Sequence, residues 1–423
     1  MSSILPDESP SATAGPKRPD PSVRSAAGRR VAVLAVHYVR VGDADYRGGA
    51  EKYILQVLTA LLDAGAAVRV GYSGTSIYDD LLARIEPTRL LVERTDWLND
   101  ALSGDARLNL ATIRDRRRWL AASGADTVLA VQQAGGGAFG ASLVAARTLG
   151  LRVVSSVRQL PGELPPPSGK RWLGVVPSPQ WWRQRLIWRR RLPAWCCDAI
   201  IFNSRRVADR YAQAYGWPRR RFRIIPNGEP SPARLRAADR PPRHIAAIGR
   251  VTAAKGADAV LDAFALVAER HPDARLTYFG DGPLIPVLRS RAAGLGLGDR
   301  VVFAGYRDDR ESIYRDVDLC VQASRRESLS NSVIEALARG IPCIVTDVGG
   351  LPEAVIHDQN GLIVPPDRPE TLAAALSRLL SDSQTFARFS RAAAILARER
   401  FDLRRVMRET VETVLGLAPA TRT

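Results

Sequence analysis

The sequence predicts an α/β protein with two doubly wound domains. Two observations favour this fold class: short apolar runs alternate with amphipathic helical segments, and the alternation restarts after a proline-rich stretch near the middle of the chain. Strands that alternate with helices form parallel sheets covered by helices on both faces. The length of 423 residues exceeds what one core usually spans and suggests two domains of roughly 150 to 200 residues each.

The first half of the chain supplies the elements of one sheet. Residues 31–36 are an apolar run that is typical of a buried parallel strand. After Gly48 and Gly49, apolar residues at helical spacing predict an amphipathic helix that ends at Gly65. Further strands of this half are expected at residues 68–72, 127–131, 152–157 and 199–202.

The second half repeats the pattern. Its strands are expected at residues 244–248, 276–279, 301–303, 319–322 and 343–346, with one helix carrying apolar residues between 260 and 267 and another near 332–339. Residues 226–232 hold three prolines and two more follow at 241 and 242, so this stretch continues neither a helix nor a central strand. We place the hinge between the domains there.

These patterns divide the chain into four parts. Residues 1–28 are rich in Pro, Ser, Ala and Gly and lack the apolar stretch of a secretory signal, so we expect a disordered leader. An N-terminal domain at 29–226 and a C-terminal domain at 227–394 follow. Residues 395–423 are expected to form a helix that packs back toward the N-terminal domain.

The composition is that of an ordinary globular protein, with 46% hydrophobic and 25% charged residues. No run of eighteen apolar residues, the length that favours a membrane-spanning helix, is present. Two of the four cysteines are adjacent, at Cys196 and Cys197, and the others, Cys320 and Cys343, are isolated. This spacing matches neither a disulfide framework nor a metal site, and we interpret the cysteines as reduced, buried thiols of a cytosolic protein.

The most specific motif runs from Ser324 to Pro342. Ser330 or Asn331 is expected to cap a helix whose N-terminal N–H groups and dipole attract phosphate. Glu327 before this helix and Glu335 within it can accept hydrogen bonds from sugar hydroxyls and from a ribose. Two glutamates eight residues apart also occur on ordinary solvated helices, so the spacing alone leaves that interpretation open.

Two cations follow the first strand of the second half. Gly249 and Arg250 come directly after that strand and Lys255 lies in the same loop, at the sheet edge where α/β folds bind ligands. Two fixed cations can neutralise a departing diphosphate without a metal, although either alone is also typical of a surface charge. Gly280 and Gly282, after the next strand, are small enough to let the backbone approach a nucleotide.

Several motifs occur in one order along the chain: Gly48-Gly-Ala-Glu-Lys52, Ile225-Pro-Asn-Gly228, Gly249-Arg250 with Lys255-Gly256, Phe279-Gly-Asp-Gly-Pro283, the Glu327 and Glu335 pair, and Thr346-Asp-Val-Gly-Gly-Leu-Pro-Glu353. In this order the sequence resembles the family-4 glycosyltransferases of the GT-B fold, from about residue 30 to residue 400. The C-terminal half matches that family closely and the N-terminal half loosely. Two Rossmann-like domains that face each other across a cleft are the fold this resemblance implies.

The resemblance also implies retaining hexosyl transfer without a cofactor or metal ion, with the donor held by the C-terminal domain and the acceptor by the N-terminal domain. It implies that Arg250 and Lys255 bind the diphosphate, that Glu327 binds the transferred sugar and that Glu335 binds the ribose. The remaining donor-binding residues that it implies are Gly48, Gly49, Gly249, Gly280, Gly282, Ser328, Leu329, Ser330 and Asn331.

One position departs from the family. Many members have a histidine just after the strand that here spans 153–157, whereas this chain has Arg158 and Gln159. Arg158 is a candidate to hold a phosphate or an acceptor hydroxyl, but it cannot act as a base. His37 is the other acceptor-side candidate, and an ordinary loop histidine is the alternative interpretation.

The net charge of +17 is concentrated in one region, since residues 170–223 hold fourteen Lys or Arg against two acidic residues. Five of the eight tryptophans lie among these arginines: Trp172, Trp181, Trp182, Trp188 and Trp195. This pattern is typical of a helix at the interface of an anionic membrane, and we expect residues 170–195 to bind one. Packing inside the domain and base stacking on nucleic acid are the alternatives, but no nucleic-acid-binding module is recognised.

The leading hypothesis is a glycosyltransferase of polysaccharide biosynthesis that moves a sugar from a nucleotide sugar to a lipid-linked or polysaccharide acceptor. We expect it in the cytoplasm, as a peripheral protein on the inner face of the membrane. A noncatalytic subunit that binds a nucleotide sugar or a partner transferase is the main alternative, and a nucleic-acid-binding protein is a further one.

Overall fold

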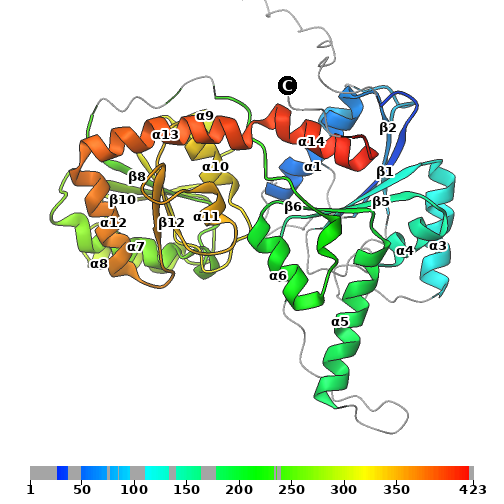
Figure 1. The fold of residues 1–423 in the computed structure, drawn as a ribbon. Coiled ribbons are helices and arrows are strands. Elements are labelled where there is room, and N and C mark those ends of the chain that lie inside the picture. The colour runs from blue at the N-terminus through cyan, green and yellow to red at the C-terminus, as the bar shows by residue number, and fades with distance from the viewer. Residues whose placement is uncertain are drawn as a thin grey trace, which may run out of the picture.

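The computed structural model describes residues 26–36, 49–73, 77–83, 85–95, 110–132, 140–162, 178–232, 235 and 240–418. It contains two parallel sheets, one in each half of the chain, and helices cover both faces of each sheet (Figure 1). The predicted fold class of two doubly wound α/β domains is confirmed. Most of the leader lies outside the described residues, but Ala26 is buried and its N–H donates to the Ala64 carbonyl at 2.7 Å.

The N-terminal sheet has the order β3-β2-β1-β4-β5-β6-β7, and all its neighbouring strands are parallel. Its strands are β1 Arg30–Val36, β2 Ala67–Ser73, β3 Leu90–Arg94, β4 Thr127–Gln132, β5 Arg152–Val157, β6 Ala199–Phe202 and β7 Phe222–Ile224. Its helices are α1 Gly49–Asp63, α2 Asp79–Leu82, α3 Leu110–Ser123, α4 Gly140–Thr148, α5 Pro179–Cys196 and α6 Arg205–Tyr215. Helix α1 packs on one face of this sheet, while α4 and α6 pack on the other.

The C-terminal sheet has the order β10-β9-β8-β11-β12-β13 and is also parallel. Its strands are β8 His244–Ile248, β9 Arg275–Phe279, β10 Val301–Gly305, β11 Leu319–Gln322, β12 Cys343–Thr346 and β13 Gly361–Val364. Its helices are α7 Ala257–Ala268, α8 Ile285–Gly294, α9 Arg310–Tyr314, α10 Asn331–Ala338, α11 Leu351–Ala354, α12 Pro369–Ser381 and α13 Ser383–Phe401. Helices α7 and α12 cover one face, and α10 and α13 the other.

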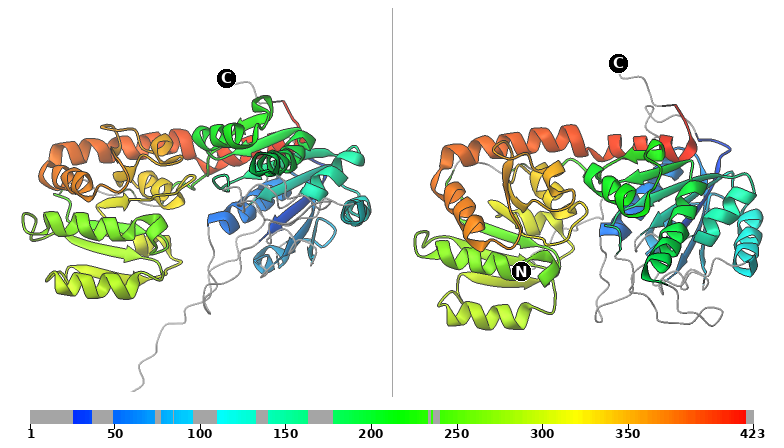
Figure 2. Two further views of the ribbon diagram at one scale, coloured as in Figure 1. Left: turned by 90° about the horizontal axis from the view of Figure 1, so that it is seen from below. Right: turned by 60° about the horizontal axis from the view of Figure 1, so that its bottom comes forward.

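The chain crosses between the domains twice, and the two crossings are joined. The backbone N–H of Glu229 donates to the Phe401 carbonyl at 2.8 Å, and the N–H of Leu403 donates to the Glu229 carbonyl at 3.0 Å. Helix α14 (Leu403–Leu415) then lies against the N-terminal domain (Figures 1 and 2), where Val406 and Val411 join the apolar core beneath α1. The final segment is therefore two helices, α13 and α14, that meet at Asp402.

The apolar pattern of the sequence predicted the bounds of the strands it identified to within one residue at one or both ends, or two at one end. The strands expected at 152–157, 199–202, 244–248, 319–322 and 343–346 have those bounds, and the other predicted strands are one or two residues longer. Strands β3, β7 and β13 were not predicted. All three lie at sheet edges and are three to five residues long.

Candidate functional site

The predicted donor residues gather at the carboxyl ends of the C-terminal strands, on the side that faces the N-terminal domain. Gly249 and Arg250 follow β8, and Glu327 lies on the loop between β11 and α10. On that loop, Ser328 Oγ donates to the carbonyl of Arg158 in the other domain at 2.7 Å. The loop that carries Glu327 is therefore part of the contact between the two domains.

Lys255 and Glu327 form a close pair. The Lys255 Nζ lies 2.5 Å from Oε2 of Glu327, and Oε1 accepts from the Ser328 N–H at 3.1 Å. Both side chains are partly accessible, at 25% and 11% of their surface. Arg250 is exposed and forms no ion pair with any residue that the structure describes. The structure thus joins two of the three predicted catalytic residues and leaves the third as a solvent-facing cation nearby in sequence.

The turn that presents Lys255 is held by Arg325. The Arg325 side chain pairs with Asp258 at 2.7 and 2.9 Å, and its N–H donates to the Ala254 carbonyl at 3.0 Å. These bonds tie the Lys255 turn to the loop of Glu327, because Arg325 lies two residues before that glutamate. Sequence reasoning assigned no role to Arg325.

Helix α10 begins where the motif predicted, with Ser330 at the N-cap position. The Ser330 hydroxyl makes no capping bond; it lies 2.9 Å from the Ser332 hydroxyl and 3.4 Å from the Gln322 side chain. The backbone N–H groups of a first helical turn have no partner within their helix. Leu329 is buried just before the cap, so it anchors the loop in the core.

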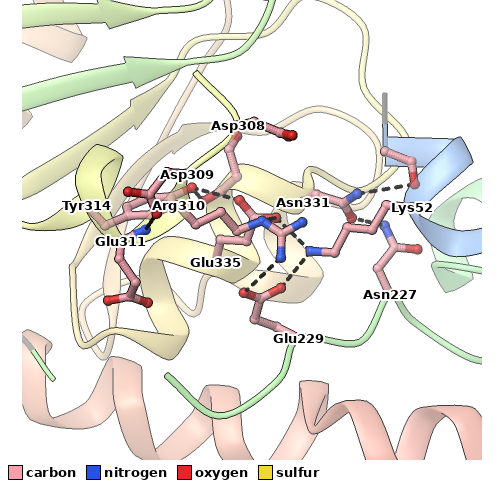
Figure 3. A network of polar contacts seen from close by, with 12 residues as sticks. Lys52, Asn227, Glu229, Asp308, Asp309, Arg310, Glu311, Tyr314, Asn331 and Glu335 are labelled. Atoms are coloured by element: carbon pink, nitrogen blue, oxygen red, sulfur yellow. Dashed lines mark hydrogen bonds and ion pairs between the residues drawn. The ribbon is translucent and has the colours of Figure 1, made fainter. Parts of the chain in front are cut away.

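Glu335 lies deeper and is surrounded by donors from two segments, the first turn of α1 and helix α9 (Figure 3). Its Oε1 lies 2.7 Å from the Nζ of Lys52 in the N-terminal domain and 3.3 Å from Nε of Arg310. Its Oε2 lies 3.1 Å from the Tyr314 hydroxyl. Burial, with the nearby Glu335 charge, raises the pKa of Tyr314 well above its usual value, so that hydroxyl stays protonated and can donate.

A pocket of about 310 Å³ lies beside this group of charges. It is lined by residues 229–232 of the crossing segment, by Asp308–Glu311 and by Arg339. Carboxylates and arginines alternate along its wall, and Arg339 pairs with both Glu229 at 3.2 Å and Glu311 at 3.0 Å. The pocket is therefore a polar recess at the hinge.

Three of the predicted glycines have no room for a side chain. A Cβ on Gly49 would lie 2.5 Å from Nδ2 of Asn331, so the start of α1 touches the start of α10 across the domains. Gly280 packs against the carbonyl of Gly249, and Gly282 packs against the carbonyl of Val251. Gly48 and His37 lie outside the described residues.

Arg158 is buried at the junction of the domains, with 7% of its surface exposed. Its guanidinium donates to Ser156, to the Ile225 carbonyl and to Asn227, each at 3.1 Å, and stacks 3.6 Å from the centre of the Tyr53 ring. Nη2 has no hydrogen-bond partner within the described part of the chain. Burial lowers the pKa of this group below its usual value, yet an arginine stays charged. Its present contacts hold the segment that enters the hinge.

The sequence did not indicate an individual role for the Gly349-Gly350 turn or for Glu353. A Cβ on Gly349 would lie 1.7 Å from the Glu327 carbonyl, so this turn packs directly against the loop that carries Glu327. The Glu353 carboxylate accepts from the N–H groups of Arg205 and Arg206 at 2.8 and 2.7 Å. A residue of the C-terminal domain thus caps helix α6 of the N-terminal domain. The only sequence signal for this contact was the motif from Thr346 to Glu353.

Helix α5 extends away from the body of the N-terminal domain (Figure 1). The exposed fractions of Trp181, Trp188 and Trp195 are 39%, 67% and 56%. In contrast, Arg191 turns back and donates to the Tyr215 carbonyl at 2.9 Å. Among the residues that the structure describes, no helix combines the length and hydropathy needed to cross a bilayer. Trp172 lies outside the described residues.

The comparisons with known proteins show the family of this chain. The glycosyltransferase group 1 family model matches residues 242–382, and the glycosyltransferase family 4 model matches residues 47–228. The two family models and the fold together define a glycosyltransferase of the GT-B type. The chain belongs to family 4 of these enzymes.

Curated relatives match part of the chain. Mannosylfructose-phosphate synthase from Agrobacterium fabrum is 30% identical over 52% of this chain and 53% of its own length. A GDP-mannose-dependent phosphatidylinositol monomannoside mannosyltransferase from Mycobacterium tuberculosis is 30% identical over 44% of this chain and 53% of its own length. The chain therefore spans about half the length, or less, of the first curated relatives it matches.

Solved structures match nearly the whole fold. Anabaena HepE, solved in complex with UDP, has a TM-score of 0.69 at 19% identity and covers 92% of this chain and 100% of its own. WaaG, a glycosyltransferase involved in lipopolysaccharide biosynthesis, has a TM-score of 0.64 at 16% identity over 91% of this chain and 100% of its own. At this identity the likeness establishes the GT-B fold.

Proposed function

We propose that this chain is a retaining glycosyltransferase that moves a hexose from a nucleotide-diphosphate sugar to a lipid-linked or polysaccharide acceptor. The observation that carries the proposal is the Lys255–Glu327 pair, partly accessible beside the N-terminus of α10 and facing the other domain. A cation, a carboxylate and a helix N-terminus together suit a ligand that has both hydroxyl groups and a diphosphate. The HepE complex with UDP supports a nucleotide donor.

In this proposal Lys255 and Arg250 stabilise the leaving diphosphate. The charge on that group grows as its bond to the sugar breaks, and fixed cations stabilise it most when they are already in place. Glu327 accepts hydrogen bonds from the transferred sugar, and Glu335 accepts them from the ribose. The loop at Gly48 and Gly49 closes over the reacting groups.

Transfer with retention needs no protein base at Arg158. The acceptor oxygen bonds to the anomeric carbon on the face from which the diphosphate leaves, and the carbon–oxygen bond to the diphosphate breaks. The departing phosphate oxygen takes the proton of the acceptor hydroxyl, so atoms and charge balance without another reactant. The cations that stabilise the diphosphate are side chains, which supports transfer without a metal.

The acceptor class rests on the relatives and on α5. The mycobacterial relative is a mannosyltransferase acting on a phosphatidylinositol monomannoside, and another relative, from Rhizobium meliloti, belongs to lipopolysaccharide core biosynthesis. Exposed tryptophans on α5 can enter the headgroup region of a membrane that holds such an acceptor. We therefore place the enzyme at the surface of an anionic membrane, on the cytoplasmic side.

The function is tested by a thermal-shift screen of UDP-, GDP- and ADP-sugars, followed by transfer assays with the sugar that binds. We expect one class of nucleotide sugar to raise Tm, the product to keep the donor's anomeric configuration, and EDTA to leave the rate unchanged. Inversion at the anomeric carbon would contradict retention, and loss of activity in EDTA with recovery in Mg²⁺ would contradict metal independence. Binding without transfer would favour the noncatalytic subunit.

Membrane binding is tested by sedimentation with vesicles of anionic and of neutral phospholipid. We expect binding to anionic vesicles that weakens as salt rises, because exposed charges are screened beyond about 8 Å at physiological ionic strength. Replacing Trp181 and Trp188 with alanine should release the protein while nucleotide binding is unchanged. The matched control is alanine at Leu266 and Val287, apolar residues that are 50% and 61% exposed in the other domain. Equal binding by the tryptophan variant would show that α5 is only domain structure.

A further inference from the structure

Lys52 connects three parts of the chain through two short ion pairs. Its Nζ lies 2.7 Å from Oε1 of Glu335 on α10 and 2.7 Å from Oε2 of Glu229 in the crossing segment (Figure 3). The exposed fractions of the three side chains are 16% for Lys52, 12% for Glu335 and 1% for Glu229. Charges this well shielded interact more strongly than those on an open surface.

Each carboxylate also has a cation from the C-terminal domain. Arg339 lies 3.2 Å from Glu229, and Arg310 lies 3.3 Å from Glu335. Within the part of the chain that the structure describes, Lys52 is the cation that the N-terminal domain contributes to this group. Without Lys52 both carboxylates would still be paired, but the domains would lose the connection.

The position of Lys52 in the first turn of α1 links these ion pairs to the alignment of the two domains at the donor site. Lys52 lies three residues after Gly49, and the Gly49 carbonyl accepts from the Asn331 side chain at 3.4 Å. Asn331 in turn accepts from Asn227 at 2.6 Å. The start of α1 is therefore aligned against both the start of α10 and the hinge.

We propose that Lys52 is a positioning residue, which sets the start of α1, from Gly49 to Lys52, in register with the donor bound by the C-terminal domain. This inference rests on the proposed function, because it assigns Lys52 to the alignment of the two domains at the same site. Glu229 is the anchored partner of Lys52, because the Glu229 backbone joins the two segments that cross between the domains. Lys52 itself contacts Glu229 and Glu335, and we assign it no contact with the sugar or the diphosphate.

A positioning role and a purely structural role predict different effects on kcat and on nucleotide affinity. Loss of a positioning residue lowers kcat alone, whereas loss of a structural residue lowers both. Donor binding depends on the C-terminal domain, whose groups around Glu335 stay paired when Lys52 is removed. The chemical step depends on the alignment of the two domains, and small misalignments lower kcat strongly. Loss of Lys52 should therefore lower kcat and leave nucleotide affinity nearly intact.

The test compares Lys52→Met, Lys52→Arg and a matched control, Arg69→Met, which breaks a partly buried pair with Glu93 at 2.8 Å in the same domain. We expect Lys52→Met to lower kcat at least about tenfold and the Kd of the product nucleoside diphosphate to change by less than about threefold. Lys52→Arg should recover most of the activity, and Arg69→Met should behave as the parent. Unchanged kcat, or a parallel loss of nucleotide affinity, would overturn the proposal.

A second variant and a second readout keep the test independent. Glu229→Gln removes the hinge end of the connection, leaves Lys52 paired with Glu335, and should lower kcat in the same direction by a smaller factor. In both variants, amide hydrogen exchange should rise in the first turn of α1 and not in α12. Unchanged exchange there would overturn the inference even if the parent transfers no sugar, whereas absent transfer by the parent with the expected exchange would count against the proposed function alone.

Discussion

The two sides of the interdomain junction use their charged side chains differently. On the donor side, Lys255 and Glu327 pair within one domain and stay partly accessible at 25% and 11%. On the acceptor side, Arg158 is 7% exposed and bonds to the segment that leads into the hinge. A charge that faces solvent beside a helix terminus is available to a ligand, whereas a buried one with backbone partners holds the fold. We therefore expect the transfer chemistry to depend mainly on the C-terminal domain.

The largest effect is expected on the donor side. Replacing Lys255 or Glu327 with alanine should lower kcat/KM by well over tenfold, about a hundredfold to a thousandfold, because removing one preorganised polar group that stabilises a transition state costs about 2.7 to 4 kcal/mol. Initial rates with the donor found by the screen measure this decrease. Arg291→Ala, which breaks an exposed pair with Asp262 at 2.7 Å, is the control and should keep full activity. Near-parental turnover in either donor-side variant would remove this site.

An intermediate effect is expected at Arg158. Its size distinguishes a role in the stability of the fold from a role in acceptor binding. Arg158→Met should lower the free energy of unfolding by about 1.5 to 3 kcal/mol, the range for a hydrogen bond to a charged group. Denaturant titration measures this change, and Phe222→Leu in the same domain gives a comparison that alters packing and no charge. Should the variant keep its stability and instead raise the acceptor KM, Arg158 would be an acceptor ligand and the contrast between the two sides would fail.

The smallest effect is expected at His244, far from the donor pair at the start of β8. Burial, with the nearby Arg275 charge, lowers the pKa of this imidazole below its usual 6.5. The unfolded chain then binds more protons as the pH falls below about 6.5, so stability is lost there and is fully present above it. His244→Gln should show a smaller drop in Tm between pH 7.5 and pH 5.0 than the parent. An equal drop would place the acid sensitivity elsewhere.

The residues of the donor side could be predicted because each is local to a strand end. Lys255 follows β8 by a few residues and Glu327 follows β11, so the sheet itself brings them to one edge. The partners of Glu335 could not be predicted. Lys52 is separated from it by 283 residues, and nothing in either local pattern relates them.

The sequence alone predicts the alternation of strands and helices, because apolar periodicity is a property of neighbouring residues. It also determined where the donor motif lies, since loops at strand ends follow from that alternation. Three other features are seen in the three-dimensional structure alone: Arg158 is buried, Glu229 joins the two crossings, and α14 packs against the N-terminal core. These features depend on which distant segments touch and how much water they exclude. Which side chains are buried, and which charges form pairs, can therefore be determined only once the two domains have been placed together.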